Sequence, residues 1–252
     1  MASSHPAGTV YDTAALGYWV QARQPLTSLI FVLPMLLAYE AGIILLNKDA
    51  IRNGAEVWLR TTLDAVGFGQ YFLLPVLTIT ILLAWHHTTH QPWQVSPSVF
   101  YGMAVESILL AFCLQKLLHL QTLFRPAIAQ IAAQLPGSQG MMSAAQRVVR
   151  TSVAYLGAGI YEELLFRVIL LSATIWILRW LGVPRRPGLF LAIVLTSLLF
   201  SAAHYLGVYG EPIHWFSFLF RFLAGMFFAV LFVYRGFGVA VGAHAGYDIL
   251  VG

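Results

Sequence analysis

Long apolar runs recur along the whole chain and constrain its fold more than any other feature. They include Leu26–Leu46, Val99–Leu120 and Trp215–Tyr234. An α-helix needs about 20 mostly apolar residues to cross the hydrocarbon core of a bilayer. A backbone surrounded by lipid must satisfy its own hydrogen bonds, so such runs form helices. We therefore predict an all-α fold, a polytopic transmembrane helical bundle of about seven helices.

Four further apolar segments complete this prediction. We place them at Tyr71–Trp85, Val148–Leu181, Leu189–Leu206 and Phe237–Val251. The last is short for a crossing, so we expect its neighbours to shield it from lipid. Small residues recur along it at helical spacing, which lets helix backbones approach closely in a membrane. These residues are Gly238, Gly242 and Gly246.

Composition agrees with a lipid-exposed surface. Charged residues make up 10% of the 252 residues, against roughly 25% in a typical soluble domain. The membrane bilayer is therefore the expected partner of most of this surface. The basic residues that give the net charge of +4 are scattered at helix ends, which indicates membrane anchoring and not nucleic-acid binding. The oligomeric state does not follow from the sequence.

We divide the chain into an N-terminal cytoplasmic or interfacial segment, residues 1–25, and a single transmembrane domain, residues 26–252. The first segment lacks the basic start and apolar core of a cleavable signal peptide. We expect the first apolar run to remain in the mature protein as a membrane span. The polar stretch 121–147 is interpreted as an interfacial amphipathic segment or a loop.

Charged residues inside the predicted span Val148–Leu181 need partners or a function, because each costs a few kcal/mol near the bilayer centre. Glu163 and Arg167 are four residues apart, so they share a helix face and can pair. Glu162 is rotated about 100° away and lacks that partner. Burial disfavours the ionised form of a carboxyl group, so one of the two glutamates is suited to act as a base or acid.

Two further groups of polar residues lie on other predicted helices. Phe200 and His204 fall near the end of one span, and His244 and Asp248 are four apart in the last segment. Within one bundle these residues can converge with the two glutamates. A carboxylate that takes a proton from water, a histidine that helps to hold that water and further donors for the oxyanion together suit hydrolysis.

The ordered motifs resemble those of the CAAX-protease and bacteriocin-processing family of intramembrane proteases. That pattern is Glu-Glu-x-x-x-Arg, then Phe-x-x-x-His, then a late His-x-x-x-Asn or Asp, and it matches the chain over roughly residues 151–252. The motif residues in this chain are Glu162, Glu163, Arg167, Phe200, His204, His244 and Asp248. The first three spans are not diagnostic of the family.

The resemblance implies an intramembrane endopeptidase of the glutamate type. Glu162 and His204 would activate the attacking water, and His244 and Asp248 would serve the oxyanion or position the substrate. Glu163 and Arg167 would brace the helix, with Phe200 in support. Aspartate in place of asparagine at position 248 cannot donate a hydrogen bond unless protonated, so it is also a candidate to orient His244.

The expected partner is a peptide or protein substrate at the membrane, and the expected location is a bacterial plasma membrane. Family members are often described as metalloproteases, and histidines with carboxylates can bind zinc. Since the sequence has no His-Glu-x-x-His pair, we favour a mechanism without a metal, with zinc as the alternative.

Three other interpretations of the buried carboxylates stay open. The protein could be a non-catalytic membrane scaffold. It could also be a proton-coupled transporter, in which Glu40 and Glu106 form a proton path with Glu162 and Glu163. A di-iron oxidoreductase, which would contain bound iron, is the third.

Overall fold

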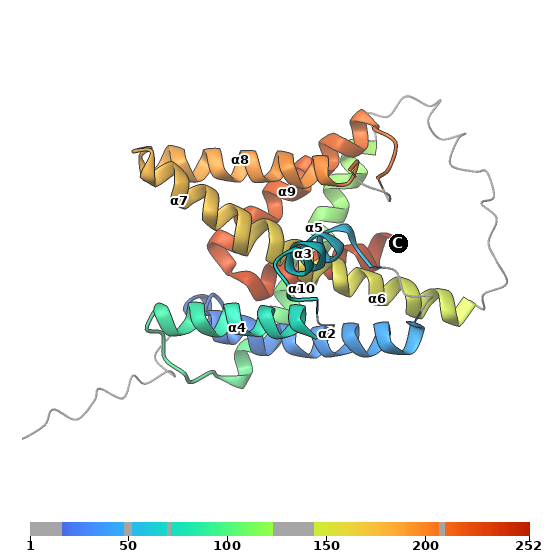
Figure 1. Ribbon diagram of the computed structural model, residues 1–252, viewed down its shortest axis with the longest axis horizontal. Coiled ribbons are helices and arrows are strands. Elements are labelled where there is room, and N and C mark those ends of the chain that lie inside the picture. Colours follow the sequence, from blue (N-terminus) through green and yellow to red (C-terminus); the bar gives the residue numbers. More distant parts are fainter. Residues whose placement is uncertain (1–16, 48–51, 70–71, 123–143, 207–209) are drawn as a thin grey trace, which may run out of the picture.

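The computed structural model describes residues 17–47, 52–69, 72–122, 144–206 and 210–252 (Figure 1). These residues form helices and no strand, which confirms the predicted all-α bundle. The elements are α1 Tyr18–Gln21, α2 Pro25–Leu46, α3 Gly54–Ala65, α4 Leu73–Thr88, α5 Pro97–Thr122, α6 Ala144–Glu163, η5 Leu164–Leu171, α7 Ser172–Trp180, α8 Arg185–Ala203, α9 Trp215–Arg235 and α10 Phe237–Val251. Most of the polar stretch 121–147 and of the segment 1–25 lies outside the described residues.

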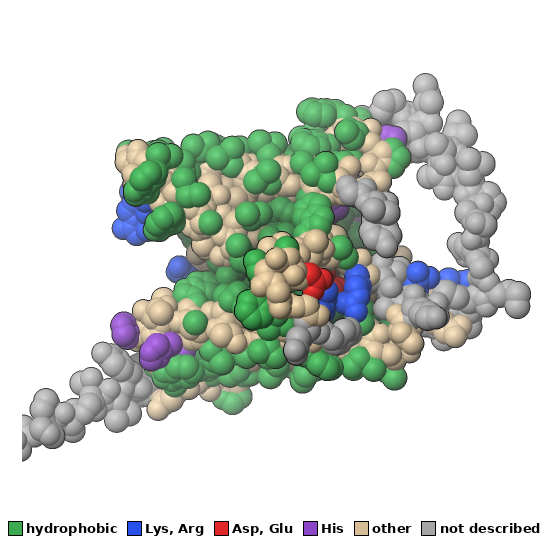
Figure 2. Space-filling model, viewed as in Figure 1, with side chains coloured by type: hydrophobic (Ala, Val, Ile, Leu, Met, Phe, Trp, Pro, Cys, Tyr) green, Lys and Arg blue, Asp and Glu red, His purple; other side chains and the backbone are tan. Residues whose placement is uncertain are grey.

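Four of the described helices, α2, α5, α8 and α9, are long and apolar enough to cross a membrane. Helices α4 and α10 are apolar but shorter. Figure 2 shows hydrophobic side chains over much of one face of the molecule, whereas charged side chains gather near α3, on α6 and at the left end of the layer that contains α7 and α8. The protein is therefore an integral membrane protein.

The predicted helix Val148–Leu181 is continuous but changes its winding. It begins as α6, passes into the π-helical segment η5 directly after Glu163, and continues as α7. In a π-helical stretch each backbone N–H bonds to the carbonyl of the fifth residue before it, and such stretches are frequent at functional sites. Here the change begins one residue after the paired glutamates.

Helix α3 was not expected from the sequence. It begins at Asn53, whose side chain accepts a hydrogen bond from the backbone N–H of Glu56 at 2.8 Å. Asparagine is among the preferred residues at this position because its oxygen satisfies an otherwise unpaired N–H of the first turn. Helix α3 packs against α6, so it lies beside the paired glutamates.

The short helix α10 forms the centre of the bundle. It packs against α2, α5, α6 and α9, and nine of its fifteen residues are buried, which confirms the prediction that neighbours shield it. In Figure 1 it lies between a layer that contains α7 and α8 and another that contains α2 and α4. Its glycines allow this placement, since a Cβ added at Gly242 would lie 2.9 Å from Cβ of Ser107 on α5.

Helix α6 lies very close to α10 at Gly159, one turn before the two adjacent glutamates. A Cβ added there would lie 2.9 Å from Cβ of Ala245 and 3.0 Å from its backbone nitrogen. Because a backbone atom cannot rotate away, any side chain at this position must push the two helices apart. The α6–α10 contact therefore places the glutamates of α6 beside the histidine of α10.

We predict that Gly159→Ala lowers the free energy of unfolding by about 1–3 kcal/mol, as other overpacked sites do. Gly246→Ala is the matched control, since its added Cβ would meet only Ala111 at 3.4 Å, an ordinary contact. Thermal unfolding of both variants in detergent measures the difference. Equal midpoints would show that the α6–α10 contact is looser than described.

Candidate active site

Glu163 is completely buried and is held by two partners from different helices. Its Oε1 lies 2.8 Å from Nδ1 of His244 on α10, and its Oε2 lies 3.2 Å from Nε of Arg167 on η5. The pairing of Glu163 with Arg167 expected from their spacing is therefore present. A carboxylate is only an acceptor, so Nδ1 of His244 carries the proton of that hydrogen bond.

Arg167 is also completely buried, and aromatic rings meet its charge. Its guanidinium lies 4.7 Å from the centroid of the Phe200 ring. Phe200 in turn packs edge-on against Phe166 and against His204. A buried cation over an aromatic face is stabilised by about 2 kcal/mol. The contact of Phe200 with Arg167 therefore links α8 to η5.

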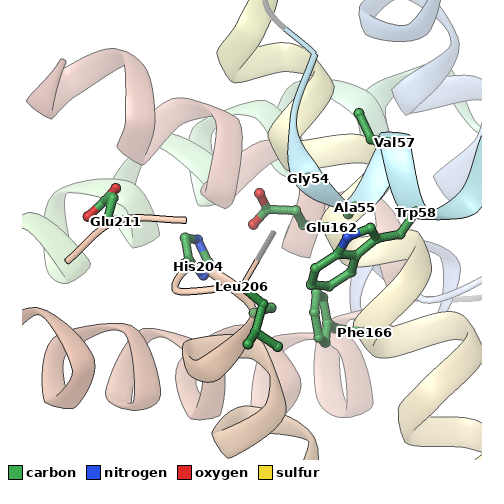
Figure 3. Close-up of a pocket in the computed structure, with 10 residues that line it drawn as sticks. Gly54, Ala55, Val57, Trp58, Glu162, Phe166, His204, Leu206 and Glu211 are labelled. Atoms are coloured by element: carbon green, nitrogen blue, oxygen red, sulfur yellow. The ribbon is translucent and has the colours of Figure 1, made fainter. Parts of the chain in front are cut away.

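Glu162 faces the other way and is much less constrained. Its Oε2 is buried but has no hydrogen-bond partner among the described residues, and it lies 3.7 Å from Nε2 of His244. Figure 3 shows its carboxylate pointing into a cavity of about 290 Å³. The two adjacent glutamates thus have different environments, as the rotation between them predicts.

His204 follows the last residue of α8 and lines the same cavity as Glu162. Its Nδ1 lies 2.9 Å from the carbonyl oxygen of Phe200. A carbonyl can only accept, so Nδ1 carries the proton of this hydrogen bond, and in the neutral tautomer with that proton Nε2 is left as an acceptor. The structure shows Glu162 and His204 around one cavity and gives no direct bond between them.

His244 is fixed on its ring face as well as at Nδ1. It stacks on Phe228 with ring centroids 4.4 Å apart and the planes only 10° from parallel. Its Nε2 lies 3.7 Å from Oδ2 of Asp248. That distance is too long for a hydrogen bond, so Glu163 and not Asp248 makes the hydrogen bond that fixes the ring.

A second cavity, of about 240 Å³, adjoins the first. His244 and Asp248 line it together with Phe228 and Arg221, and His204 lines both cavities. Each of the three sequence motifs therefore contributes at least one residue to the lining of these two cavities, and His204 lines both. The larger cavity thus contains the carboxylate of Glu162 and the imidazole of His204. The smaller cavity contains the imidazole of His244 and the carboxylate of Asp248.

The two carboxylates proposed for a proton path have partners of their own. Glu40 accepts a hydrogen bond of 2.7 Å from the hydroxyl of Tyr161. Glu106 forms an ion pair with Arg235 at the end of α9. Each glutamate is thus held within its own local network.

Sequence reasoning missed the residues that α3 contributes to the larger cavity. Gly54, Ala55, Val57 and Trp58 line it, as does Glu211, which forms an ion pair of 2.7 Å with Arg221. The one available signal was Asn53 three residues before Glu56, a spacing that starts a helix. Nothing in that signal indicated that the helix would lie over the glutamates.

Among the described residues, no three His, Cys, Asp or Glu side chains are grouped as a metal ion requires. The nitrogen Nδ1 of His244 already donates to Glu163.

Comparison with known proteins agrees with the resemblance seen in the motifs. Residues 144–250 match the family model described as type II CAAX prenyl endopeptidase Rce1-like. The chain matches no curated protein. It also matches no solved structure. The matched segment contains α6 to α9 and nearly all of α10, and with them both glutamates, Arg167 and both histidines of the site. Residues 144–250 are thus similar to the Rce1-like family of CAAX-type endopeptidases, and this match indicates that the protein is an intramembrane peptidase.

Proposed function

We propose that the protein is a glutamate-type endopeptidase in which Glu162 and His204 activate the water that attacks the peptide bond. The different environments of the two adjacent glutamates carry this proposal. Glu163 is completely buried, with a hydrogen bond to His244 and an ion pair with Arg167, whereas the Glu162 side chain lines a cavity and has no hydrogen bond to its Oε2 from the described residues. A general base must be able to reach the proton that it takes.

The two acceptors of the larger cavity orient the water. The Glu162 carboxylate and Nε2 of His204 each accept one hydrogen of the same water, which leaves an oxygen lone pair for the substrate carbonyl carbon. As the carbon–oxygen bond forms, Glu162 takes one proton and the carbonyl oxygen gains negative charge. When the carbon–nitrogen bond breaks, that proton passes to the leaving amine, and the products are an acid and an amine.

His244 serves the oxyanion in this scheme. Glu163 fixes the His244 ring through Nδ1, so a proton on Nε2 points away from Glu163. In this scheme it points toward the smaller cavity, which His244 lines. Donors that are already in place when charge develops contribute several kcal/mol to such reactions. Asp248, 3.7 Å from the same nitrogen, helps to hold that proton on the ring.

The proposed substrates are membrane-associated peptides or proteins, cut at or within the bilayer. The family description names prenylated CAAX sequences, and we take these as the first substrate to test, beside leader peptides and membrane-anchored regulators. A bacterial plasma membrane is the proposed location, on the strength of the family resemblance.

We predict that Glu162→Gln lowers kcat at least about 100-fold, because the amide cannot take the proton from water. Cleavage of a quenched peptide ending in a prenylated CAAX sequence, by protein purified in detergent, measures this. Glu40→Gln is the matched control, since its side-chain oxygen still accepts the Tyr161 hydroxyl and it lies outside both cavities. Equal activity of the two variants would exclude Glu162 as the base.

Metal chelators should leave the activity within about twofold, because the described site lacks a set of ligands that zinc prefers. The measurement is the same peptide assay after incubation with EDTA or 1,10-phenanthroline. Loss of activity that added zinc restores would overturn the metal-free mechanism.

A further inference from the structure

Helix α3 lies outside the segment that matches the family model, yet it forms a wall of the larger cavity. Four of its residues line that cavity beside Glu162 (Figure 3). Figure 3 shows the Trp58 indole beside the ring of Phe166. The wall is thus part of the surroundings of the proposed base, although no catalytic motif includes it.

An apolar groove continues from the cavity along the same helix. It has a volume of about 250 Å³ and lies among α3, η5 and α8. Trp58, Phe166, Ala203 and Leu206 line both the cavity and the groove. Thr62 is the polar side chain on its lining, and its hydroxyl already donates to the carbonyl of Trp58 at 2.8 Å. The groove therefore suits an apolar group joined to whatever occupies the cavity.

Glu56 holds this wall in place. Its side chain is completely buried and accepts hydrogen bonds from Tyr39 on α2 and from Arg52 and Arg60 beside it. The Tyr39 ring packs edge-on against Tyr161, with centroids 5.4 Å apart. Tyr161 directly precedes Glu162 on α6, so one buried network joins α2, α3 and the helix of the proposed base.

We propose that α3 is a substrate-binding wall of the active site. In this proposal, which rests on the proposed function, Trp58 contacts an apolar side chain of the peptide next to the bond that is cut. Trp58 is then a residue that determines specificity, and Glu56 is a positioning residue that acts through Trp58. The continuity of the groove with the cavity that contains Glu162 and His204 assigns the groove to the peptide itself.

Two peptides that differ in one residue test Trp58. They carry leucine or serine next to the cut bond and are otherwise the same prenylated CAAX substrate. We expect the wild-type protein to prefer leucine about tenfold in kcat/KM, as apolar pockets do for an added apolar group, and Trp58→Ala to lose most of that preference. Trp180→Ala is the matched control, since Trp180 is 78% exposed on α7 and lines neither space.

Removal of the Tyr39 hydroxyl tests whether Glu56 positions α3. Tyr39→Phe deletes the hydrogen bond to Glu56 and keeps the ring against Tyr161, so we expect KM to rise about fivefold with kcat nearly unchanged. Tyr18→Phe deletes the same kind of bond, from Tyr18 to Glu106, in a network that lies away from both cavities. A merely structural role would lower the amount of folded protein in both variants and leave both KM values at the wild-type level.

The outcomes separate this inference from the proposed function. An active wild-type protein with unchanged preference in Trp58→Ala and unchanged KM in Tyr39→Phe overturns the role of α3 and leaves the peptidase in place. A wild-type protein that cuts neither peptide overturns the proposed function. In that case the affinity of the uncut leucine peptide decides the inference: weaker binding by Trp58→Ala supports it, and equal or absent binding overturns it.

Discussion

The buried carboxylate of Glu163 links the helices on which the site depends. It joins η5 through Arg167 and α10 through His244, and all three side chains lie in the interior. Removing charges from water is costly, and the cost is recovered only when partners and geometry are good. Loss of the Glu163 carboxylate would leave the buried charge of Arg167 without this partner, and breaking a buried pair in this way typically costs about 3–5 kcal/mol. The position of His244 relative to the cavities therefore depends on its hydrogen bond to Glu163, which Arg167 holds in place.

The same interaction explains how two neighbouring glutamates obtain different chemistry. Consecutive residues on a helix point about 100° apart, so only one of them can face both Arg167 and α10. The other, Glu162, faces the gap between α3 and the end of α8, where His204 lies. The close contact at Gly159 fixes how near α6 and α10 come. The helical rotation between the two glutamates and the absence of a side chain at Gly159 together determine that Glu163 is bound by Arg167 and α10, whereas Glu162 faces the cavity.

Much of this arrangement could be predicted from the sequence because it depends on local spacing. The apolar runs predicted the spans, the four-residue spacing predicted the Glu163–Arg167 pair, and the glycines of α10 predicted its close packing. The short length of α10 also indicated a shielded helix. The convergence of His244 with the glutamates rested on the family resemblance and on the need to hide polar groups.

What could not be predicted depends on contacts between distant segments. One partner of Glu56 is Tyr39, seventeen residues away on another helix, and no local pattern identifies such a pair. Helix α3 has no long apolar run, so its place over the cavity follows from tertiary packing alone. The hydrogen bond on His244 comes from Glu163, 81 residues earlier, although Asp248 on the same helix was the nearer candidate by sequence.

The most direct test of the peptidase claim is a comparison of new protein N-termini in cell membranes. Cells would express the wild-type protein or Glu162→Gln at matched levels, with the folding of each confirmed by its elution in detergent. We predict particular N-termini that appear with the wild-type protein and disappear with the variant, and these would identify its substrates. Identical sets of N-termini from two folded and equally abundant proteins would contradict the claim, and the buried carboxylates and histidines would then form a binding or transport site.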